Sequence, residues 1–354
     1  MNLNQNKNKE AIILIITSFN QLYNFLSYFL QNKLIRNKKI YLTIFSDNIP
    51  EELIKQFKQY IEKFVSVEVI NLKRKSINAK VNFLQFRFLN FLFYYFFVIK
   101  KMFQAKKLKI IPIISISGRM QIPVLFFMIF FSSSKIFFLE DGVGEYVPYA
   151  NFEKKHFFFF ILKKFLKLNK SRIYILQLSK QRSAYRRILN QPFLNKSHII
   201  NNRKLYENFI KNSFQKKLIF KPKCIIIGTN TSLHNINYYE NLYIETLKRI
   251  SKKYSYNRKQ ILFFFHPRIK SIHRKRLVKS LSSFSNIQPI STIIVENYLH
   301  QKNVEIVVGS LSSALYYAKT IFNKKNVYHL NDNSSFHYDN FLKVFKSVGI
   351  KSFF

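Results

Sequence analysis

The sequence predicts an α/β protein made of two doubly wound domains in tandem. Short apolar runs rich in branched residues alternate along the chain with segments of helical periodicity. Such runs are typical of strands that are covered on both faces of a parallel sheet. With 354 residues, the chain is about twice as long as one common domain. An apolar content of 48% is enough to form two cores.

The N-terminal half contains the first series of alternating elements. Residues 11–16, AIILII, are a continuous branched run and therefore a strand, and residues 22–31 follow with apolar side chains at helical spacing. The remaining expected strands are 39–46, 66–72, 110–117, 135–141 and 172–179, and the remaining expected helices are 50–64, 79–106 and 157–168. This alternation favours a doubly wound domain over residues 1–215.

A second series follows a basic stretch without clear periodicity at 211–223, where we place the linker between the domains. Its expected strands are 224–230, 259–267, 304–309 and 326–330, and its expected helices are 237–254, 273–284, 295–302 and 312–322. These elements predict a second domain at 220–335. Residues 336–354 are expected to form a C-terminal helix that packs back on the N-terminal domain.

The charge balance of the chain indicates an anionic partner. Fifty-nine Lys and Arg oppose 17 Asp and Glu, a formal net charge of +42. Nucleic acid, an anionic membrane surface and a polyanionic substrate all fit such a charge. Residues 157–168, FFFFILKKFLKL, are interpreted either as a core helix with a basic solvated side or as an interfacial helix on anionic lipid.

The cysteine content and the lengths of the apolar runs indicate the compartment in which the protein is expected to work. Cys224 is the single cysteine, so the chain forms no internal disulfide, and a reducing compartment is expected. The apolar runs at 88–99 and 120–134 are shorter than the roughly 20 residues of a spanning helix. We therefore expect a cytoplasmic protein without a signal peptide, associated peripherally with the inner face of the cell membrane.

Carboxylates are concentrated in one place in the first domain. Only four acids occur between residues 69 and 206, and three of them lie in the segment 137–149, FFLEDGVGEYVPY. Glu140 and Asp141 follow an expected strand and precede Gly142. Adjacent carboxylates repel each other, and this repulsion together with partial burial raises the pKa of at least one of them. A raised pKa suits a general base that accepts a hydroxyl proton. A solvated turn is the alternative interpretation.

Polar side chains also follow the strands of the second domain. His266 and Pro267 come directly after ILFFF, and a histidine there can donate to a phosphate or act as an acid. Arg268 offers a second phosphate contact. The alternative is a structural histidine at a strand end.

A serine-rich segment separates the strand 304–309 from the next helix. Ser310, Ser312 and Ser313 provide hydroxyls beside free backbone N–H groups, which predicts an anion site. A helix N-cap is the alternative, although a cap needs only one serine.

Three further residues are candidates for nucleotide contacts. Glu296 can bond a ribose hydroxyl or act only as an acid in the first turn of a helix. Gly228 and Asn230, in IIIGTN, are expected to let the chain turn near a ligand, although a glycine after a strand is common in any case. The sequence has no GxGxxG, no GxxxxGK[ST], no HExxH and no DxD pair. We therefore expect a metal-independent nucleotide site without a cofactor.

The ordered set LEDG, FFFHP and VVGSLSS resembles the bacterial sialyltransferases of glycosyltransferase families 52 and 38, which act on lipooligosaccharide or capsule polysaccharide. These families share a [D/E][D/E]G motif, an HP motif and a late serine-rich motif, and the segment TSFNQLYN is similar to their N-terminal loop. The resemblance spans about residues 11–335. One departure is that phenylalanines precede HP, where relatives often have a polar residue.

The resemblance implies a GT-B fold with two Rossmann-like domains facing across a cleft. It implies inverting transfer of sialic acid from CMP-sialic acid, with Glu140 as the base and His266 acting on the departing phosphate. Ser312 and Ser313 would hold that phosphate, and Glu296 would bond the ribose. Asp141 and Gly142 would shape the catalytic loop.

Other functions remain open from the sequence alone. One alternative keeps the GT-B fold with another nucleotide sugar, such as CMP-Kdo or a UDP-sugar. A second is a basic nucleic-acid-binding protein, although no nucleic-acid-binding motif is found and the aromatic residues lie in apolar blocks. No specific nucleic-acid partner is therefore expected; the expected partners are a CMP-sugar donor, a glycan acceptor and an anionic membrane.

Overall fold

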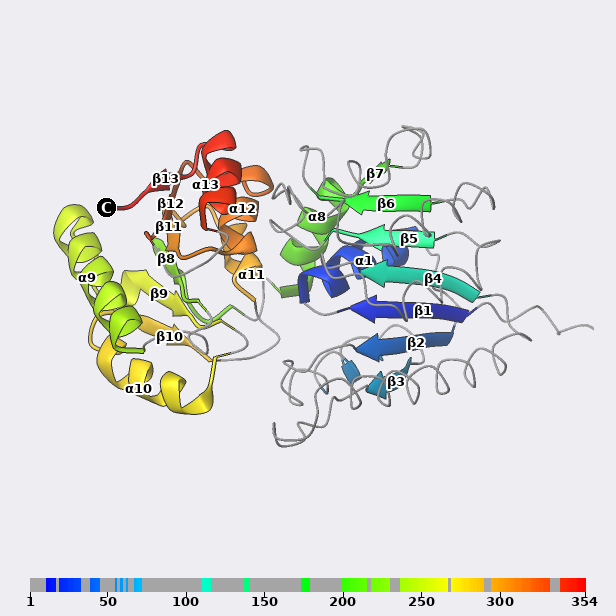
Figure 1. Cartoon of the computed structure of the whole chain (residues 1–354), viewed down its shortest axis with the longest axis horizontal. Coiled ribbons are helices and arrows are strands. Elements are labelled where there is room, and N and C mark those ends of the chain that lie inside the picture. Colours follow the sequence, from blue (N-terminus) through cyan, green and yellow to red (C-terminus); the bar gives the residue numbers. More distant parts are fainter. Residues whose placement is uncertain are drawn as a thin grey trace, which may run out of the picture. The chain divides into compact units, whose positions relative to one another are not determined.

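A computed structural model of the chain divides into two compact units, which Figure 1 shows with their elements labelled. The first unit comprises residues 1–141, 149–177 and 183–202, and the second comprises 142–148, 178–182 and 203–354. The structure describes residues 11–16, 19–32, 39–44, 55, 58–59, 62, 67–71, 110–115, 136–140, 173–178, 199–214, 218–229, 236–266, 269–289, 294–331 and 338–354. Each unit is built around its own sheet.

The first unit contains a seven-stranded sheet in which every pair of neighbours is parallel. Its strands are β1 (Ala11–Ile16), β2 (Lys39–Ile44), β3 (Val67–Asn71), β4 (Ile110–Ser115), β5 (Ile136–Leu139), β6 (Ile173–Gln177) and β7 (Ile199–Asn201). The spatial order is β3-β2-β1-β4-β5-β6-β7. This is the strand order of a Rossmann-like sheet with one added edge strand. The six strands expected from the sequence are confirmed, and β7 is additional.

Helix α1 (Phe19–Gln31) follows β1 and packs on the first sheet. Residues 21–27 are all buried, so this part of the helix is covered on every side. The ring of Phe29 contacts that of Phe137 in β5, with centroids 5.2 Å apart. This apolar contact holds α1 beside the end of β5, where the carboxylate motif begins.

The second unit repeats the same winding in a six-stranded parallel sheet. Its strands are β8 (Cys224–Ile227), β9 (Ile261–Phe264), β10 (Asn286–Gln288), β11 (Ile306–Gly309), β12 (Asn326–His329) and β13 (Lys351–Ser352). The order β10-β9-β8-β11-β12-β13 is again that of a Rossmann-like fold, counted from β8. The α/β class with two Rossmann-like units is therefore confirmed.

Helices cover both faces of the second sheet (Figure 1). They are α9 (Ile236–Tyr254), α10 (Ser271–Leu281), α11 (Glu296–Leu299), α12 (Ser313–Thr320) and α13 (Tyr338–Ser347). Helix α8 (Arg203–Phe214) also belongs to this unit and contacts α11, and a 3₁₀ turn, η6 (Arg258–Gln260), precedes β9. One face carries α9 and α10, whose buried residues join Cys224, Ile226 and Phe263 in one core. Because side chains alternate along a strand, Phe264 points to the other face, where it contacts Tyr298 of α11.

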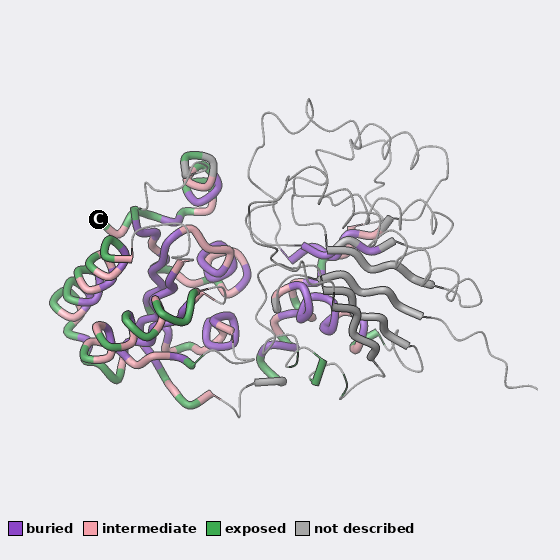
Figure 2. Tube along the Cα trace, turned by 60° about the horizontal axis from the view of Figure 1, so that its bottom comes forward, coloured by how far each residue is buried: buried purple, intermediate pink, exposed green. Residues whose placement is uncertain are grey.

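The apolar spacing of α9 accounts for its position against the sheet. Tyr239, Tyr243, Leu247 and Ile250 recur every three or four residues and are fully buried. The buried and exposed colours alternate along this helix in Figure 2. The strands beneath it are buried throughout, which explains why their sequences are continuously apolar rather than alternating.

Several expectations differ from the structure or lie outside the described residues. The expected linker at 211–223 begins inside α8, which the sequence interpretation missed although Leu205, Tyr206, Phe209 and Ile210 have helical spacing. The C-terminal segment contains α13 and also β13, which pairs with β12. The helices expected at 79–106 and 157–168 lie outside the described residues. Among the residues that the structure describes, no helix is long and apolar enough to span a membrane.

Gly309 ends β11 at a point of close contact between β11 and β8. A Cβ atom at this position would lie 2.8 Å from the carbonyl oxygen of Ile227 and 2.9 Å from its Cβ. Gly228 is similar, because a Cβ there would lie 3.1 Å from the Phe264 carbonyl oxygen. The glycines at these strand ends thus allow three parallel strands to approach one another.

We expect Gly309→Ala to lower the free energy of unfolding by about 1–3 kcal/mol, because the strand backbone must move to admit the methyl group. Chemical denaturation measures this free energy of unfolding for each variant. Gly349→Asn is the matched control: Gly349 has a φ of +77° and ordinary space around its Cβ. Asparagine tolerates that conformation, so only a small change is expected. Equal stability of Gly309→Ala and the wild type would contradict the close approach.

Candidate functional site

The carboxyl ends of four strands in the second unit bring the predicted residues together. Gly309 pairs in register with Ile227 and with His329, and Ile227 pairs with Phe264. The residues that follow these strand ends therefore lie along one edge of the sheet. They include Gly228, His266, Ser310 and Ser312. This is the edge at which ligands bind to doubly wound sheets.

The three serines differ in their surroundings. Ser310 is 1% exposed, and its hydroxyl oxygen has no hydrogen-bond partner among the described residues. Ser312 is the N-cap of α12 and its oxygen accepts a bond of 3.2 Å from the Ala314 N–H. Ser313 begins the helix. One serine thus caps α12, as the alternative interpretation required, while the hydroxyl of Ser310 is buried without a hydrogen-bond partner among the described residues.

His266 lies just beyond β9 and is half-buried. Its carbonyl oxygen accepts a bond of 3.0 Å from the Ile269 N–H. The phenylalanines before it serve packing: Phe263 and Phe265 belong to the core under α9, and Phe264 lies on the opposite face. The strand therefore supplies apolar packing, and His266 is its first polar side chain at the sheet edge.

Glu296 is the first residue of α11 and is 3% exposed. The helix is held at the carboxyl ends of β9 and β10, because Tyr298 contacts Phe264 and its hydroxyl donates to Gln288 Oε1 at 3.1 Å. The Asn297 side chain accepts from the Ile294 N–H at 2.7 Å. These bonds place Glu296 at the same edge of the sheet as His266.

Glu140 belongs to the first unit, directly after β5, and is 1% exposed. Its backbone N–H donates to the Leu176 carbonyl at 3.2 Å. That carbonyl also accepts from Asn24 Nδ2 of α1 at 3.1 Å. The proposed base is therefore held at the carboxyl edge of its own sheet by β6 and α1.

The sequence interpretation missed a buried polar cluster beside this position. Asn24, Ser27 and Asn202 are each 0% exposed. Asn202 Nδ2 lies 2.8 Å from Asn24 Oδ1 and 2.9 Å from Ser27 Oγ. The signal in the sequence is the pair of polar residues, three apart, within the apolar helix 22–31. Buried polar groups are normally hydrogen-bonded to one another because each unpaired group is costly.

His329 is a second residue that the sequence interpretation did not single out. It ends β12 opposite Gly309 and is 4% exposed. Its ring lies 6.1 Å from that of Phe345 in α13. Burial lowers the pKa of His329, and the nearby Lys346 lowers it further. The imidazole is therefore neutral near pH 7, beside the serine segment.

Five of the predicted site residues lie outside the described part of the chain: Asp141, Gly142, Asn230, Pro267 and Arg268. Their roles stay predictions.

Solved structures of similar architecture identify the type of fold. A sialyltransferase from Photobacterium damsela matches with a TM-score of 0.54 and 13% identity, over 96% of this chain and 79% of that chain. A putative UDP-N-acetylglucosamine 2-epimerase from Listeria monocytogenes matches with a TM-score of 0.54 and 11% identity, over 91% of this chain and 78% of that chain. A UDP-GlcNAc 2-epimerase from Methanocaldococcus jannaschii matches with a TM-score of 0.53 and 13% identity, over 97% of this chain and 88% of that chain. The fold is thus of the GT-B type.

The family follows from the sequence. The family model described as alpha-2,8-polysialyltransferase matches residues 12–331. The chain therefore belongs to the alpha-2,8-polysialyltransferase family, and the resemblance to bacterial sialyltransferases is confirmed. It is a glycosyltransferase that uses a nucleotide-sugar donor and a glycan acceptor. No curated protein matches the sequence.

We expect acidification from pH 7 to pH 5 to lower the free energy of unfolding, in part through His329. The unfolded chain binds a proton on this histidine below about pH 6.5, whereas the folded protein resists protonation at a lowered pKa. Stability therefore rises with pH across this window. Denaturation at several pH values should show that His329→Gln loses less free energy of unfolding between pH 7 and pH 5 than the wild type does. An identical pH dependence of stability in the two proteins would contradict a contribution from His329.

Proposed function

We propose that this protein transfers sialic acid from CMP-sialic acid to a hydroxyl of a cell-surface glycan, with inversion at the anomeric carbon. The family match over most of the chain supports the transferred sugar. The buried hydroxyl of Ser310 at the sheet edge is the observation that supports an anionic leaving group. The acceptor is proposed to be a lipooligosaccharide or capsule glycan, and membership of the alpha-2,8-polysialyltransferase family favours an acceptor that already ends in sialic acid.

In the proposed reaction, the acceptor oxygen forms a bond to the anomeric carbon while the bond from that carbon to the phosphate oxygen of CMP breaks. CMP leaves with the electron pair, and the acceptor proton passes to the Glu140 carboxylate. A single displacement on the face opposite the leaving group inverts the configuration, as in other inverting glycosyl transfers. Asp141 and Gly142 are proposed to shape the loop that follows Glu140.

The departing phosphate is proposed to be stabilised by the second unit. Ser310 Oγ and the first N–H groups of α12 offer donors to developing negative charge. Ser313 is proposed to add a hydroxyl, and His266 to donate a proton or a hydrogen bond to the same phosphate. Glu296 is proposed to bond the ribose, while Gly228, Asn230, Pro267 and Arg268 line the nucleotide. No metal is required in this scheme.

The net charge of +42 supports two further proposals about partners. An anionic leaflet attracts basic proteins from the cytoplasm, so peripheral binding at the inner face of the membrane fits the charge. A polyanionic acceptor such as a sialic acid polymer is attracted for the same reason.

Calorimetry with CMP, CMP-sialic acid and UDP-sugars tests the donor. Binding of CMP and CMP-sialic acid, with sialyl transfer that persists in EDTA, is the expected result. The structurally similar epimerases make UDP-sugars the relevant alternative, because one of them, from Neisseria meningitidis, is bound to UDP-GlcNAc. Binding of UDP-sugars without CMP would overturn the proposed donor, and loss of transfer in EDTA would overturn metal independence.

We expect Glu140→Gln to lower the transfer rate by about 10²- to 10⁴-fold, because the amide cannot accept the acceptor proton. The shape of the buried side chain is kept, so CMP affinity and melting temperature should stay near the wild-type values. Glu245→Gln on the exposed side of α9 is the control carboxylate and should leave the transfer rate unchanged. A fully active Glu140→Gln protein would exclude Glu140 as the base.

Ser310→Ala and Ser312→Ala should separate ligand binding from helix capping. Ser310→Ala is expected to weaken CMP binding by about tenfold with unchanged stability, because its hydroxyl has no partner among the described residues. Ser312→Ala removes the N-cap and should cost about 1 kcal/mol of stability. Calorimetry and denaturation of both variants distinguish the two roles, and unchanged CMP affinity in Ser310→Ala would remove this residue from the site.

A further inference from the structure

Helix α10, in the second unit, begins near the carboxyl edge of its sheet. It follows β9 and His266, so its first turn lies close to the strand ends that carry the candidate site. Its sequence, SIHRKRLVKSL, contains basic residues and no acid. Leu277 and Leu281 are buried and belong to the core shared with α9, which determines the side of α10 that faces outward.

The outward side of α10 is a stripe of exposed residues. Ile272, Lys275 and Lys279 follow one another at intervals of three and four residues, which places them in line along the helix, with Arg276 beside them. All four are exposed, and these four residues are the outer face of α10. Ile272 is 72% exposed. A single exposed isoleucine is ordinary on a soluble protein, but this one lies next to cations on a helix without acids.

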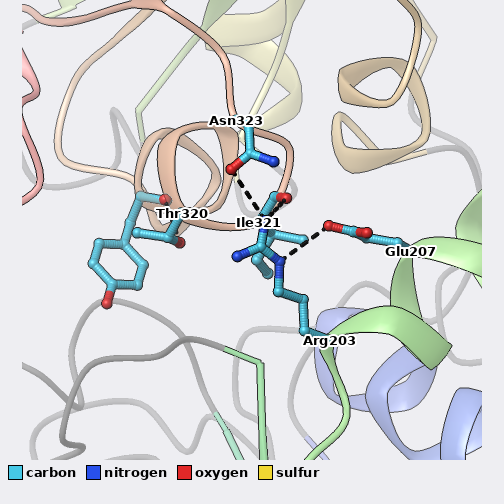
Figure 3. A network of polar contacts seen from close by, with 6 residues as sticks. Arg203, Glu207, Thr320, Ile321 and Asn323 are labelled. Carbon is cyan, nitrogen blue, oxygen red and sulfur yellow. Dashed lines mark hydrogen bonds and ion pairs between the residues drawn. The ribbon is translucent and has the colours of Figure 1, made fainter.

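Some cations of the second unit have a structural role. Arg203, the first residue of α8, donates from Nη2 to the Ile321 carbonyl oxygen at 2.6 Å and to Asn323 Oδ1 at 3.1 Å, as Figure 3 shows. Its Nε donates to Glu207 Oε1 at 3.1 Å. Ile321 is the C-cap of α12, and the C-terminal end of a helix favours a cation. The packing of α12 therefore accounts for this arginine.

The lysines on the outer face of α10 have no such role. Among the residues that the structure describes, neither Lys275 nor Lys279 makes an ion pair or a hydrogen bond through its side chain. Arg276 differs, because its Nη2 lies 2.6 Å from Glu240 Oε2 of α9, although its side chain is still 49% exposed. The two lysines therefore keep their charges in solvent, and contacts within the fold do not explain them.

Helix α9 provides a comparison within the same unit. Lys248 and Lys252 are exposed on α9 at the same spacing of four residues, but none of the aliphatic side chains of α9 is exposed. A soluble polyanion is attracted by the lysines of either helix. A sialic acid polymer is rich in carboxylates and hydroxyls and offers little apolar surface to cover Ile272. A lipid bilayer offers phosphates and, just below them, an apolar layer. The combination on α10 therefore fits a bilayer better than a glycan.

We propose that the outer face of α10 binds the surface of an anionic membrane. Lys275 and Lys279 contact lipid phosphates, and the Ile272 side chain enters the headgroup region, where it leaves water. The proposal deepens the proposed function and rests on it in one respect: a bilayer beside the carboxyl edge brings a lipid-linked acceptor close to the donor site. The binding of lipid itself is independent of the transfer reaction.

Sedimentation of the full chain with lipid vesicles tests this surface. Vesicles made of equal parts of phosphatidylglycerol and phosphatidylcholine are compared with vesicles of phosphatidylcholine alone. The wild type should bind the anionic vesicles, and the binding should weaken as the salt concentration rises. A wild type that binds neither kind of vesicle, or that binds both equally, would overturn the proposal.

Variants of the outer face should weaken this binding. Lys275→Glu combined with Lys279→Glu should lower the partition onto anionic vesicles by about 25-fold, since each lysine near an anionic surface contributes about fivefold. Ile272→Ser should lower it by about fivefold, because part of the apolar side chain no longer leaves water. All these residues are exposed, so the melting temperatures should stay at the wild-type value.

Two matched controls separate the outer face from general attraction by a basic protein. Lys248→Glu combined with Lys252→Glu makes the same change of charge at the same spacing on α9. Ile219→Ser removes an isoleucine that is 78% exposed outside α10. Both should keep vesicle binding within about threefold of the wild type, because charges farther than a Debye length from the membrane are screened. An equal loss in the α9 variant or in Ile219→Ser would overturn the assignment to α10.

Soluble polysialic acid tests the rival partner. The Lys275→Glu and Lys279→Glu protein should bind it as tightly as the α9 control does. A selective loss of affinity for polysialic acid, with vesicle binding kept, would make α10 a glycan surface and overturn the membrane proposal.

Transfer to a lipid-free acceptor separates this surface from the active site. The residues of the outer face have no part in the proposed reaction, so kcat with a soluble sialylated acceptor should equal that of the wild type in each variant. A wild type that binds anionic vesicles through α10 but transfers no sialic acid would reject the proposed function and support the membrane surface.

Discussion

Parallel pairing of the strands is the constraint on which both units depend. Every described strand pair in both sheets is parallel. Parallel strands need crossover connections, which cover both faces of the sheet, and central strands such as β1, β8 and β9 are therefore apolar throughout. Along these central strands the first polar side chains occur where the strand ends, and within each sheet these ends lie at one edge. Glu140 in one unit, and His266 and Ser310 in the other, occupy such positions as a direct result.

Placing polar groups at a buried edge has a cost that the structure offsets with hydrogen bonds. In the first unit, Asn24 and Asn202 bond to each other and to backbone groups at the end of β6 and within α1. In the second, α11 is held through Tyr298, and α12 is capped by Ser312. Buried polar groups that are bonded in this way fix one arrangement of the chain. The hydrogen bonds that offset the cost of burying these polar groups therefore also orient the candidate catalytic groups.

The sequence was sufficient for much of the fold because long apolar runs and helical spacing are local signals. The segments 11–16 and 304–309 are short continuous runs rich in branched apolar residues, which is typical of buried parallel strands. The spacing of the tyrosines in α9 indicates which face of that helix is buried. Short elements were missed. Strands β10 and β13 have three and two residues, too few for any periodicity, and they form only because a neighbouring strand offers its edge. Helix α8 was overlooked because its basic residues resemble those of the stretch that follows.

The amino-acid sequence by itself determined the fold class, the family and the strand ends at which functional residues occur. These properties depend on residue type and spacing along the chain, which carry hydrophobic periodicity and motifs directly. Only the tertiary structure showed that Ser312 caps a helix while Ser310 is buried beside it, and that His329 joins the same edge. It alone showed that Asn24 and Asn202, 178 residues apart, bond to each other next to Glu140. Such contacts depend on which strands become neighbours, and that choice is made by the packing of the whole sheet.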